Sequence, residues 1–420
     1  MEETPPIMKL FTDLMIFEVF MRLPTKDIMY SKMACKSWYK LLSSPKFTEY
    51  YTRYSPFTTT LWLHVSENPP GIIAANPLAG NAFFLLEVTE GGDYYRTYIK
   101  PKSPEFYKTG LALFVDSCNG LLFLWLKKHK YRSNCWSEKV YLCNPLFDGC
   151  IELPRYKRKI KVSLMVEYKP GYIPSTDTYK LLRVVYYSLH HLVIKEANIL
   201  TVGKDLKWRK VDDPLKHWIR TSNRGVSFKG SYHWIGKDDG IYTFDFVEEK
   251  CGRISKPPGL GMKLRVLKDH LCLIDSSDLN RLIIWTMKEY PVAKSWSKNV
   301  QLTCRFDLLP ITILGKKSGV QISQMDSNEL VSFSPDENMI EIGLGLWTTN
   351  WYDIYALTSY TPRFCPFKEE DITSLQPIKR NFWSKYLPNI CLFKDSRRGK
   401  HHLERKGIPC TRPKFYPNLH

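Results

Sequence analysis

The sequence lacks the patterns by which common classes of enzyme and metalloprotein are recognised. No nucleophile elbow, HExxH pair or Walker loop occurs, and the 11 cysteines form no CxxC pair or Cys/His spacing suited to zinc. The GxG sequences at 259–261 and 343–345 lack the third glycine of a dinucleotide-binding loop. The histidine pairs at 190–191 and 401–402 have no partner at ligand spacing. We therefore predict no catalytic residue, no bound cofactor and no metal site.

Long hydrophobic runs are also missing. The longest purely apolar run, Leu121 to Leu126, is far shorter than the roughly 20 residues that a membrane-spanning helix needs. The opening residues, Met1 to Pro6, contain no basic segment ahead of an apolar stretch, so no secretory signal is expected. These features predict a protein of the nucleus, the cytoplasm or both, without membrane contact. Most of its cysteines should be buried as small hydrophobic residues.

Acidic residues are in deficit. Lys and Arg number 61 against 42 Asp and Glu, which gives a formal net charge of +19 that could attract nucleic acid or an acidic protein. Basic residues gather at 127–132, 155–161 and 397–406. Each cluster is interpreted either as a solvated loop or as a contact for an acidic partner, and the last cluster also as a nuclear import signal. Because no nucleic-acid-binding module accompanies the charge, we do not expect nucleic acid as a partner.

Helical patterns are confined to the first fifty residues. Residues 12–23 carry apolar side chains at spacings of three and four, and Pro24 ends this helix. Thr25 is expected to cap a second short helix, and residues 34–42 to form a third that ends before Pro45. Three short helices have too little volume for a core of their own. Their apolar faces therefore need a partner, which is either the rest of this chain or another protein.

A series of residues along these helices matches a known pattern in order and spacing. The matching residues are Leu10-Phe11-Thr12-Asp13-Leu14, Glu18-Val19-Phe20, Arg22-Leu23-Pro24, Lys26, Ile28, Cys35-Lys36-Ser37-Trp38-Tyr39, Leu41-Leu42-Ser43-Ser44-Pro45 and Phe47. Together they resemble the F-box of plant F-box proteins, although Phe11 replaces the usual proline and Ser31 a frequent apolar residue. The resemblance implies docking on a Skp-family adaptor, and through it on a cullin scaffold. The residues that it implies for adaptor binding are Leu10, Leu14, Val19, Phe20, Leu23, Pro24, Ile28, Cys35, Trp38 and Leu42.

From about residue 60 onward the sequence favours β-strands. The aromatic fraction is 14%, and short runs of Val, Ile and aromatic residues alternate with Gly, Asp, Asn and Pro turns. A unit of three strands and two turns recurs from Gly120, Gly230, His270 and Glu329. No such unit can bury both of its faces alone, whereas radial stacking in a β-propeller buries them. At roughly 40–50 residues per blade the region supplies about six to eight blades. A β-sandwich is the alternative.

A second resemblance covers this β region. The matching segments are Asp116-Ser117-Cys118-Asn119-Gly120-Leu121-Leu122, Asn144-Pro145-Leu146, Leu153-Pro154, Asp177-Thr178-Tyr179-Lys180, Lys207-Trp208-Arg209, Gly230-Ser231-Tyr232-His233-Trp234, Phe244-Asp245, Trp285-Thr286-Met287-Lys288-Glu289 and Ser295-Trp296. They look like the F-box-associated domain of the same plant proteins. Four tryptophans, Trp125, Trp234, Trp285 and Trp296, either line a recognition pocket or pack the blades.

The two resemblances together predict an organisation and a role. They imply F-box helices over residues 1–50, a β-propeller-like substrate-recognition domain over 51–393 and a basic tail over 394–420. The implied role is that of a non-catalytic substrate-recognition subunit of a Skp-cullin-F-box ubiquitin ligase, which binds a target protein that the sequence does not identify. The alternative is a propeller-like protein-interaction module that works without a ligase.

Overall fold

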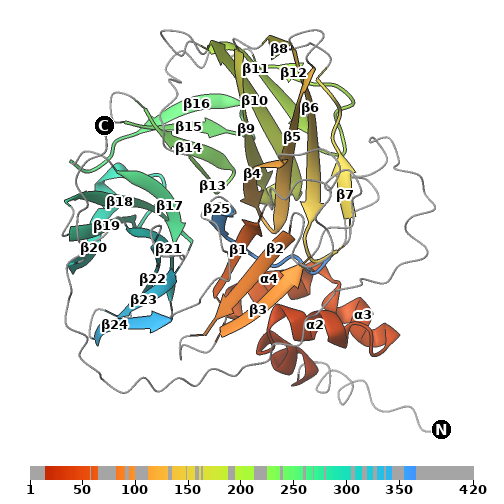
Figure 1. Cartoon of the computed structure of the whole chain (residues 1–420), viewed down its shortest axis with the longest axis vertical. Coiled ribbons are helices and arrows are strands. Elements are labelled where there is room, and N and C mark those ends of the chain that lie inside the picture. The colour runs from red at the N-terminus through yellow and green to blue at the C-terminus, as the bar shows by residue number, and fades with distance from the viewer. Residues whose placement is uncertain are drawn as a thin grey trace, which may run out of the picture.

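We describe the fold from a computed structural model (Figure 1). The structure describes residues 15–56, 58–64, 82–89, 94–99, 112–130, 135–147, 149–156, 160–161, 164–187, 194–211, 225–236, 240–258, 262–267, 269–278, 281–303, 308–314, 319–324, 329–334, 337–342 and 354–365.

The N-terminal module contains one helix more than the sequence predicted. Residues 15–21 are helical, and α2 (Thr25–Ser31), α3 (Lys36–Leu42) and α4 (Pro45–Tyr54) follow. At the start of α3 the Cys35 Sγ accepts the Trp38 amide at 3.5 Å. At the start of α4 the Ser44 hydroxyl accepts the Phe47 amide at 3.1 Å, and Pro45 stands in the first turn, where no N–H partner is needed. Pro45 therefore begins a helix as well as following one.

The rest of the described chain forms antiparallel sheets, which we number as blades. Blade 1 contains β25 (Ile354–Ser359), β1 (Thr58–His64), β2 (Ala82–Val88) and β3 (Tyr94–Ile99). Blade 2 contains β4 (Ala112–Cys118), β5 (Leu121–Lys130), β6 (Cys135–Asn144), β7 (Gly149–Glu152) and the short β8 (Ile160–Lys161). Blade 3 contains β9 (Leu164–Ile173), β10 (Thr178–Tyr187), β11 (Ile194–Thr201) and β12 (Arg209–Lys210).

The second half of the β region repeats the same plan. Blade 4 contains β13 (Val226–Phe228), β14 (Ser231–Ile235), β15 (Ile241–Asp245) and β16 (Lys250–Ile254). Blade 5 contains β17 (Lys263–Leu267), β18 (His270–Asp278), β19 (Arg281–Met287) and β20 (Trp296–Thr303). Blade 6 contains β21 (Leu308–Leu314), β22 (Gly319–Gln324), β23 (Glu329–Ser334) and β24 (Glu337–Ile342).

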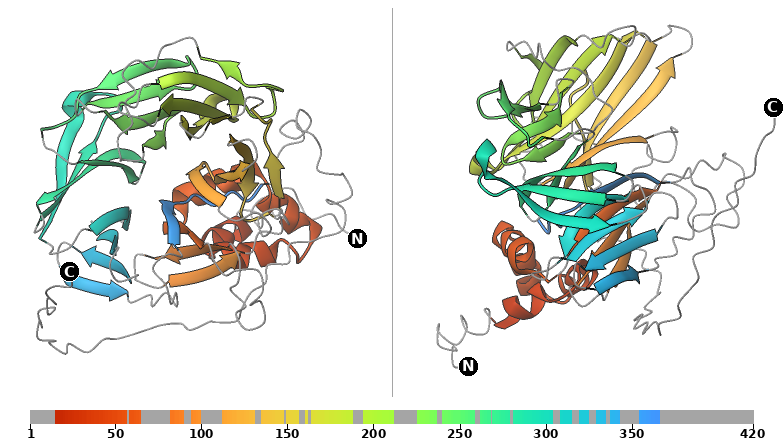
Figure 2. Two further views of the ribbon diagram at one scale, coloured as in Figure 1. Left: turned by 45° about the horizontal axis from the view of Figure 1, so that its top comes forward. Right: turned by 90° about the vertical axis from the view of Figure 1, so that its left-hand side faces the viewer.

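The blades stand in a ring (Figure 2). Their innermost strands β25, β4, β9, β13, β17 and β21 contact one another in this order, and β21 contacts β25 again, which closes the ring. Blade 1 is built from two distant parts of the chain, because β25 pairs with β1 from Thr60↔Ser359 to His64↔Ile354. The predicted mainly β, propeller-like fold with an N-terminal helical module is confirmed, and the sandwich alternative is wrong.

The predicted strand units correspond to parts of these blades. The units that start at Gly120, Gly230 and His270 are the second to fourth strands of blades 2, 4 and 5. The unit that starts at Glu329 begins on the third strand of blade 6, so that prediction was displaced by one strand. The units that start at Gly120, Gly230 and His270 omitted the innermost strands β4, β13 and β17.

The tryptophans support the packing interpretation. Trp234 is buried in the cluster between blades 3 and 4, and Trp285 and Trp296 pack against the cluster between blades 4 and 5. Trp125 packs edge-on against Tyr168 of blade 3, with ring centroids 5.4 Å apart. These side chains hold neighbouring blades together.

The cysteines whose side chains the structure describes differ in burial and bonding. Cys118, Cys272 and Cys365 are buried free thiols, as the sequence predicted for most cysteines, and Cys251 is a half-buried free thiol. Cys35 is exposed, and Cys143 is disulfide-bonded.

Candidate adaptor-binding face and its seat on the propeller

The helical module has an outer face that exposes hydrophobic side chains. Most of the large hydrophobic residues exposed in the described part of the chain lie on this module, namely Met15, Val19, Tyr30, Met33, Tyr39, Tyr50 and Tyr54. Met15 and Val19 are 63% and 59% exposed, and their separation of four residues places them on one side of the first helix. Exposed apolar side chains gathered on one small module are typical of a protein-interaction site.

The residues predicted for adaptor binding divide between two faces of this module. Leu10 and Leu14 lie outside the described residues. Val19 and Cys35 are exposed, and Leu23 and Trp38 are half-buried. The buried members are Phe20, Pro24, Ile28 and Leu42. In this arrangement the buried members can serve adaptor binding only by holding the helices in shape, and the role of the whole set stays a prediction.

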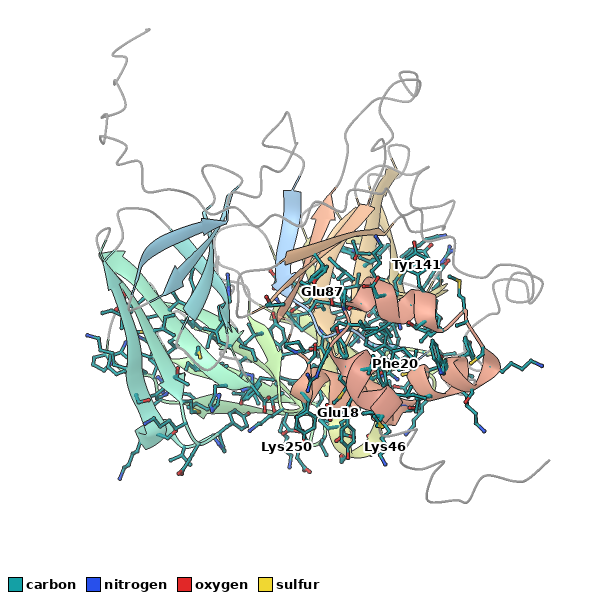
Figure 3. All side chains as sticks on the ribbon, turned by 90° about the horizontal axis from the view of Figure 1, so that it is seen from below. Glu18, Phe20, Lys46, Glu87, Tyr141 and Lys250 are labelled. Atoms are coloured by element: carbon teal, nitrogen blue, oxygen red, sulfur yellow. The ribbon has the colours of Figure 1, made fainter. Side chains whose placement is uncertain are left out.

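The inner face of the module packs against blades 1 and 2. One buried cluster contains Phe20, Met21, Ile28, Met29, Leu42, Phe47 and Tyr51 from the helices, and Leu85, Leu122, Leu124, Tyr141, Cys143 and Leu146 from the blades. Figure 3 shows Phe20 among the helices, with Glu87 and Tyr141 beside them. The helices therefore share a core with the propeller. The partner of their inner face is the rest of this chain and not another protein.

Glu87 of β2 caps α2 from outside the helix. Its two carboxylate oxygens accept the Thr25 amide at 2.9 and 3.0 Å, and Oε1 also accepts the Thr25 hydroxyl. The prediction that Thr25 caps α2 was wrong, because Pro24 is the N-cap and makes no side-chain cap. A carboxylate satisfies the free N–H groups of a helix start and is favoured by the helix dipole. Glu87 is separated from Thr25 by 62 positions, so no local sequence signal could have found it.

The carboxyl group of Glu87 is fully removed from solvent. The Tyr51 hydroxyl lies 3.3 Å from its Oε1 and also donates to the Leu23 carbonyl at 3.0 Å. Burial raises the pKa of Glu87 to about 7, and the bonds from Thr25 only partly oppose this shift.

Lys32 holds the opposite end of α2. The side chain is 4% exposed, its Nζ donates to the Phe364 carbonyl, and Nζ lies 4.6 Å from the centroid of the Phe147 ring. Burial lowers the pKa of Lys32 to about 7. Buried partners outside the helical module therefore hold both ends of α2.

Residues 360–365 follow β25 directly, and we call them the strap. Phe364 is fully buried, with its ring centroid 5.4 Å from that of Phe47 and 4.9 Å from that of Tyr51. Its amide donates to the Thr48 hydroxyl at 3.1 Å. The strand that closes the propeller thus continues directly into a segment that packs against the helices.

Two turns of blade 2 hold the strap from the other side. The Asn144 amide group donates to the carbonyls of Arg363 and Cys365 at 3.1 and 3.2 Å. The Tyr360 hydroxyl donates to the Gly120 carbonyl at 3.0 Å. Both Asn144 and Gly120 belong to segments that carry the second family resemblance. Part of that sequence pattern therefore supplies the residues that bind the strap.

The described residues contain no group of His, Cys, Asp and Glu side chains that could hold a metal ion. Both histidine pairs, both GxG sequences and the basic tail lie outside the described residues. Among the described helices, none combines the length and apolar composition needed to cross a membrane.

Comparison with protein families supplies the identity. A model of the F-box associated beta propeller domain matches residues 101–360, and a model of the F-box domain matches residues 11–50. The chain belongs to the F-box protein family. An F-box protein of Arabidopsis thaliana is 24% identical over 322 residues, which cover 68% of this chain and 71% of that protein. Putative F-box only protein 9 of the same plant is 22% identical over 402 residues, or 86% of this chain and 98% of that protein.

Solved structures resemble this F-box protein only distantly. A lectin of Aleuria aurantia is 9% identical with a TM-score of 0.32, and the match covers 74% of this chain and 97% of that chain. A likeness at this level says nothing of a ligand.

Proposed function

We propose that this F-box protein is a substrate-recognition subunit of a Skp-cullin-F-box ubiquitin ligase. The observation that carries the proposal is the division of the helical module into two faces. The inner face is buried against the propeller, and the outer face still exposes Met15, Val19, Tyr30, Met33 and Tyr39. Membership of the F-box family supports a Skp-family adaptor as the partner that we propose for that outer face.

In this role the protein does no chemistry of its own. The helices hold the adaptor and, through it, the cullin scaffold, while the propeller binds a target protein. Holding the target near the ubiquitin-charged enzyme raises its effective concentration, which accelerates a transfer performed by other subunits. The helices meet the ring at the strand ends marked by Glu87, Asn144 and Gly120. We propose that the target binds at the opposite end of the ring.

A ligase-independent interaction module is the second candidate. The docking of the helices on their own propeller favours it, because that docking gives the inner face a partner within the chain. The exposed outer face favours the ligase receptor, because a module that served only its own propeller would gain nothing from exposed Met15 and Val19.

Charge on the outer face should weaken adaptor binding. We expect the double variant M15D/V19D to bind a purified plant Skp adaptor at least about tenfold more weakly, because central hydrophobic contacts often contribute 2 kcal/mol or more. Isothermal titration calorimetry measures this, and both substitutions lie on exposed positions, so the thermal unfolding midpoint should change little.

Tyr54→Ser supplies the matched control. Tyr54 is 55% exposed on the same module but lies beyond residues 11–50 of the F-box match, so this variant should bind within about twofold of the unchanged chain. If the folded, unchanged chain binds none of several plant Skp adaptors, the ligase proposal fails and the ligase-independent module is the better account.

A further inference from the structure

We propose that the strap, residues 360–365, is a positioning element that fixes the direction in which the propeller points relative to the adaptor-binding helices. Phe364 is its central residue. The inference rests on the proposed function, since direction matters only if the outer face holds an adaptor.

The ring, the amide and the carbonyl of Phe364 all contact the helices. Its ring is enclosed by Phe47 and Tyr51 of α4, and its amide donates to Thr48 of the same helix. Its carbonyl accepts from the Lys32 ammonium group at the end of α2. A single residue of the strap therefore joins α2 to α4.

The residues on either side of Phe364 contact the propeller. The carbonyls of Arg363 and Cys365 both accept from Asn144 of blade 2. The Arg363 Nη1 donates to the Tyr179 hydroxyl of blade 3 at 2.8 Å and lies 3.6 Å from the Asp177 carboxylate. Neighbouring residues of the strap therefore bond to the helices and to the blades at the same time.

Two separated anchors on one helix explain why the strap fixes direction. Glu87 holds the start of α2 through Thr25, and the strap holds its end through Lys32. Seven residues of helix separate these points by about 10 Å. The buried cluster already packs α2 against blades 1 and 2, and the second anchor restrains the rotation about Thr25 that this apolar packing opposes only through non-directional contacts.

The consequence concerns ubiquitin transfer. A fixed direction presents the same region of a bound target, and of the propeller itself, to the charged enzyme each time. A pivoting module would spread transfer over more lysines at a lower rate for each. We therefore assign Phe364 a positioning role that determines which lysines receive ubiquitin.

The test compares Phe364→Ala with Phe364→Leu in the full chain. Fluorophores introduced through non-natural amino acids at positions 36 and 250, which are exposed on α3 and β16, report the direction by single-molecule energy transfer. Phe364→Ala keeps the backbone groups that bond Lys32 and Thr48 but removes the ring that packs on Phe47 and Tyr51, which should weaken the hold of the strap on the helices by about two orders of magnitude. The energy-transfer distribution should broaden in Phe364→Ala and stay narrow in the unchanged chain and in Phe364→Leu.

Two further readouts separate positioning from folding. The Kd for the Skp adaptor should stay within about twofold in all three proteins, because the outer face is unchanged. In a reconstituted ligase, mass spectrometry of self-ubiquitination should find more modified lysines in Phe364→Ala than in Phe364→Leu. Equal energy-transfer distributions would overturn the proposal, as would a loss of adaptor affinity in Phe364→Ala, which would give the strap a folding role. If the unchanged chain binds no adaptor, the proposed function falls, while the energy-transfer comparison still shows whether the strap fixes the helices.

Discussion

Gly120→Ala should lower the free energy of unfolding by about 2–4 kcal/mol. Gly120 has φ +77°, a conformation that side chains other than glycine rarely adopt. A Cβ there would also stand 2.5 Å from the Arg363 Cβ and 2.7 Å from the Thr361 carbonyl oxygen of the strap. The backbone atoms of the strap cannot rotate away, so the strap or the turn must shift. Chemical denaturation followed by tryptophan fluorescence measures the loss.

Gly230→Ala is the matched control for this prediction. Gly230 has the same φ of +77°, but the nearest atom to an added Cβ is the Tyr172 carbonyl oxygen at 4.0 Å. The free energy of unfolding of this variant should therefore fall only by the cost of the positive φ, about 1 kcal/mol. The difference between the two variants isolates the steric contact with the strap. Equal losses would show that the turn of Gly120 does not confine the strap.

Glu87→Gln should leave stability nearly unchanged near pH 4.5 and raise it by about 2–3 kcal/mol at pH 8. The folded state raises the pKa of Glu87 to about 7, so folding binds a proton between pH 4.5 and 7. The stability that Glu87 contributes is therefore fully present below its ordinary pKa and is lost as the pH rises through about 7. Glutamine keeps an oxygen acceptor for Thr25 and carries no charge at any pH. Unfolding free energies of both proteins from pH 4.5 to 8 measure the divergence.

Lys32→Met serves as the counterpart with the opposite sign. The folded state lowers the pKa of Lys32 to about 7, so its contribution is present above the ordinary value of 10.5 and is lost as the pH falls through about 7. The difference between Lys32→Met and the unchanged chain should thus change mainly above pH 7, whereas that of Glu87→Gln changes mainly below it. If the Glu87→Gln difference is flat with pH, Glu87 is not desolvated in solution and its place in the buried seat is wrong.

Local signals predicted the parts of the fold that depend on local chemistry. Proline at position 24 marked the end of the first helix, and the glycine turns before Leu121 and Ser231 marked the starts of blade strands. These features work because a missing N–H or a positive φ restricts the backbone wherever it occurs. Alternating apolar residues between turns were enough to indicate a ring of sheets.

Contacts between distant residues could not be predicted in the same way. No predicted strand unit falls in blade 1 or blade 3, and the pairing of β25 with β1 in blade 1 joins residues from opposite ends of the β region. Thr25 looked like a helix cap because its type suits that position, but its partner is Glu87. Family resemblance suggested Ile28 and Leu42 for adaptor binding, yet the pattern of apolar residues cannot distinguish a face that packs inside the chain from one that meets another protein.

The closing of blade 1 by β25 also governs the order in which the protein can be completed during synthesis. The helices leave the ribosome first, but Thr48 and its partner Phe364 are 316 positions apart. At about 5–20 residues per second, roughly 15–60 s pass before the strap exists. During that interval Phe47 and Tyr51 lack the ring that covers them. We expect nascent chains to need chaperone protection at this patch, and a chain that ends before residue 354 to lack both the closed ring and a fully seated F-box.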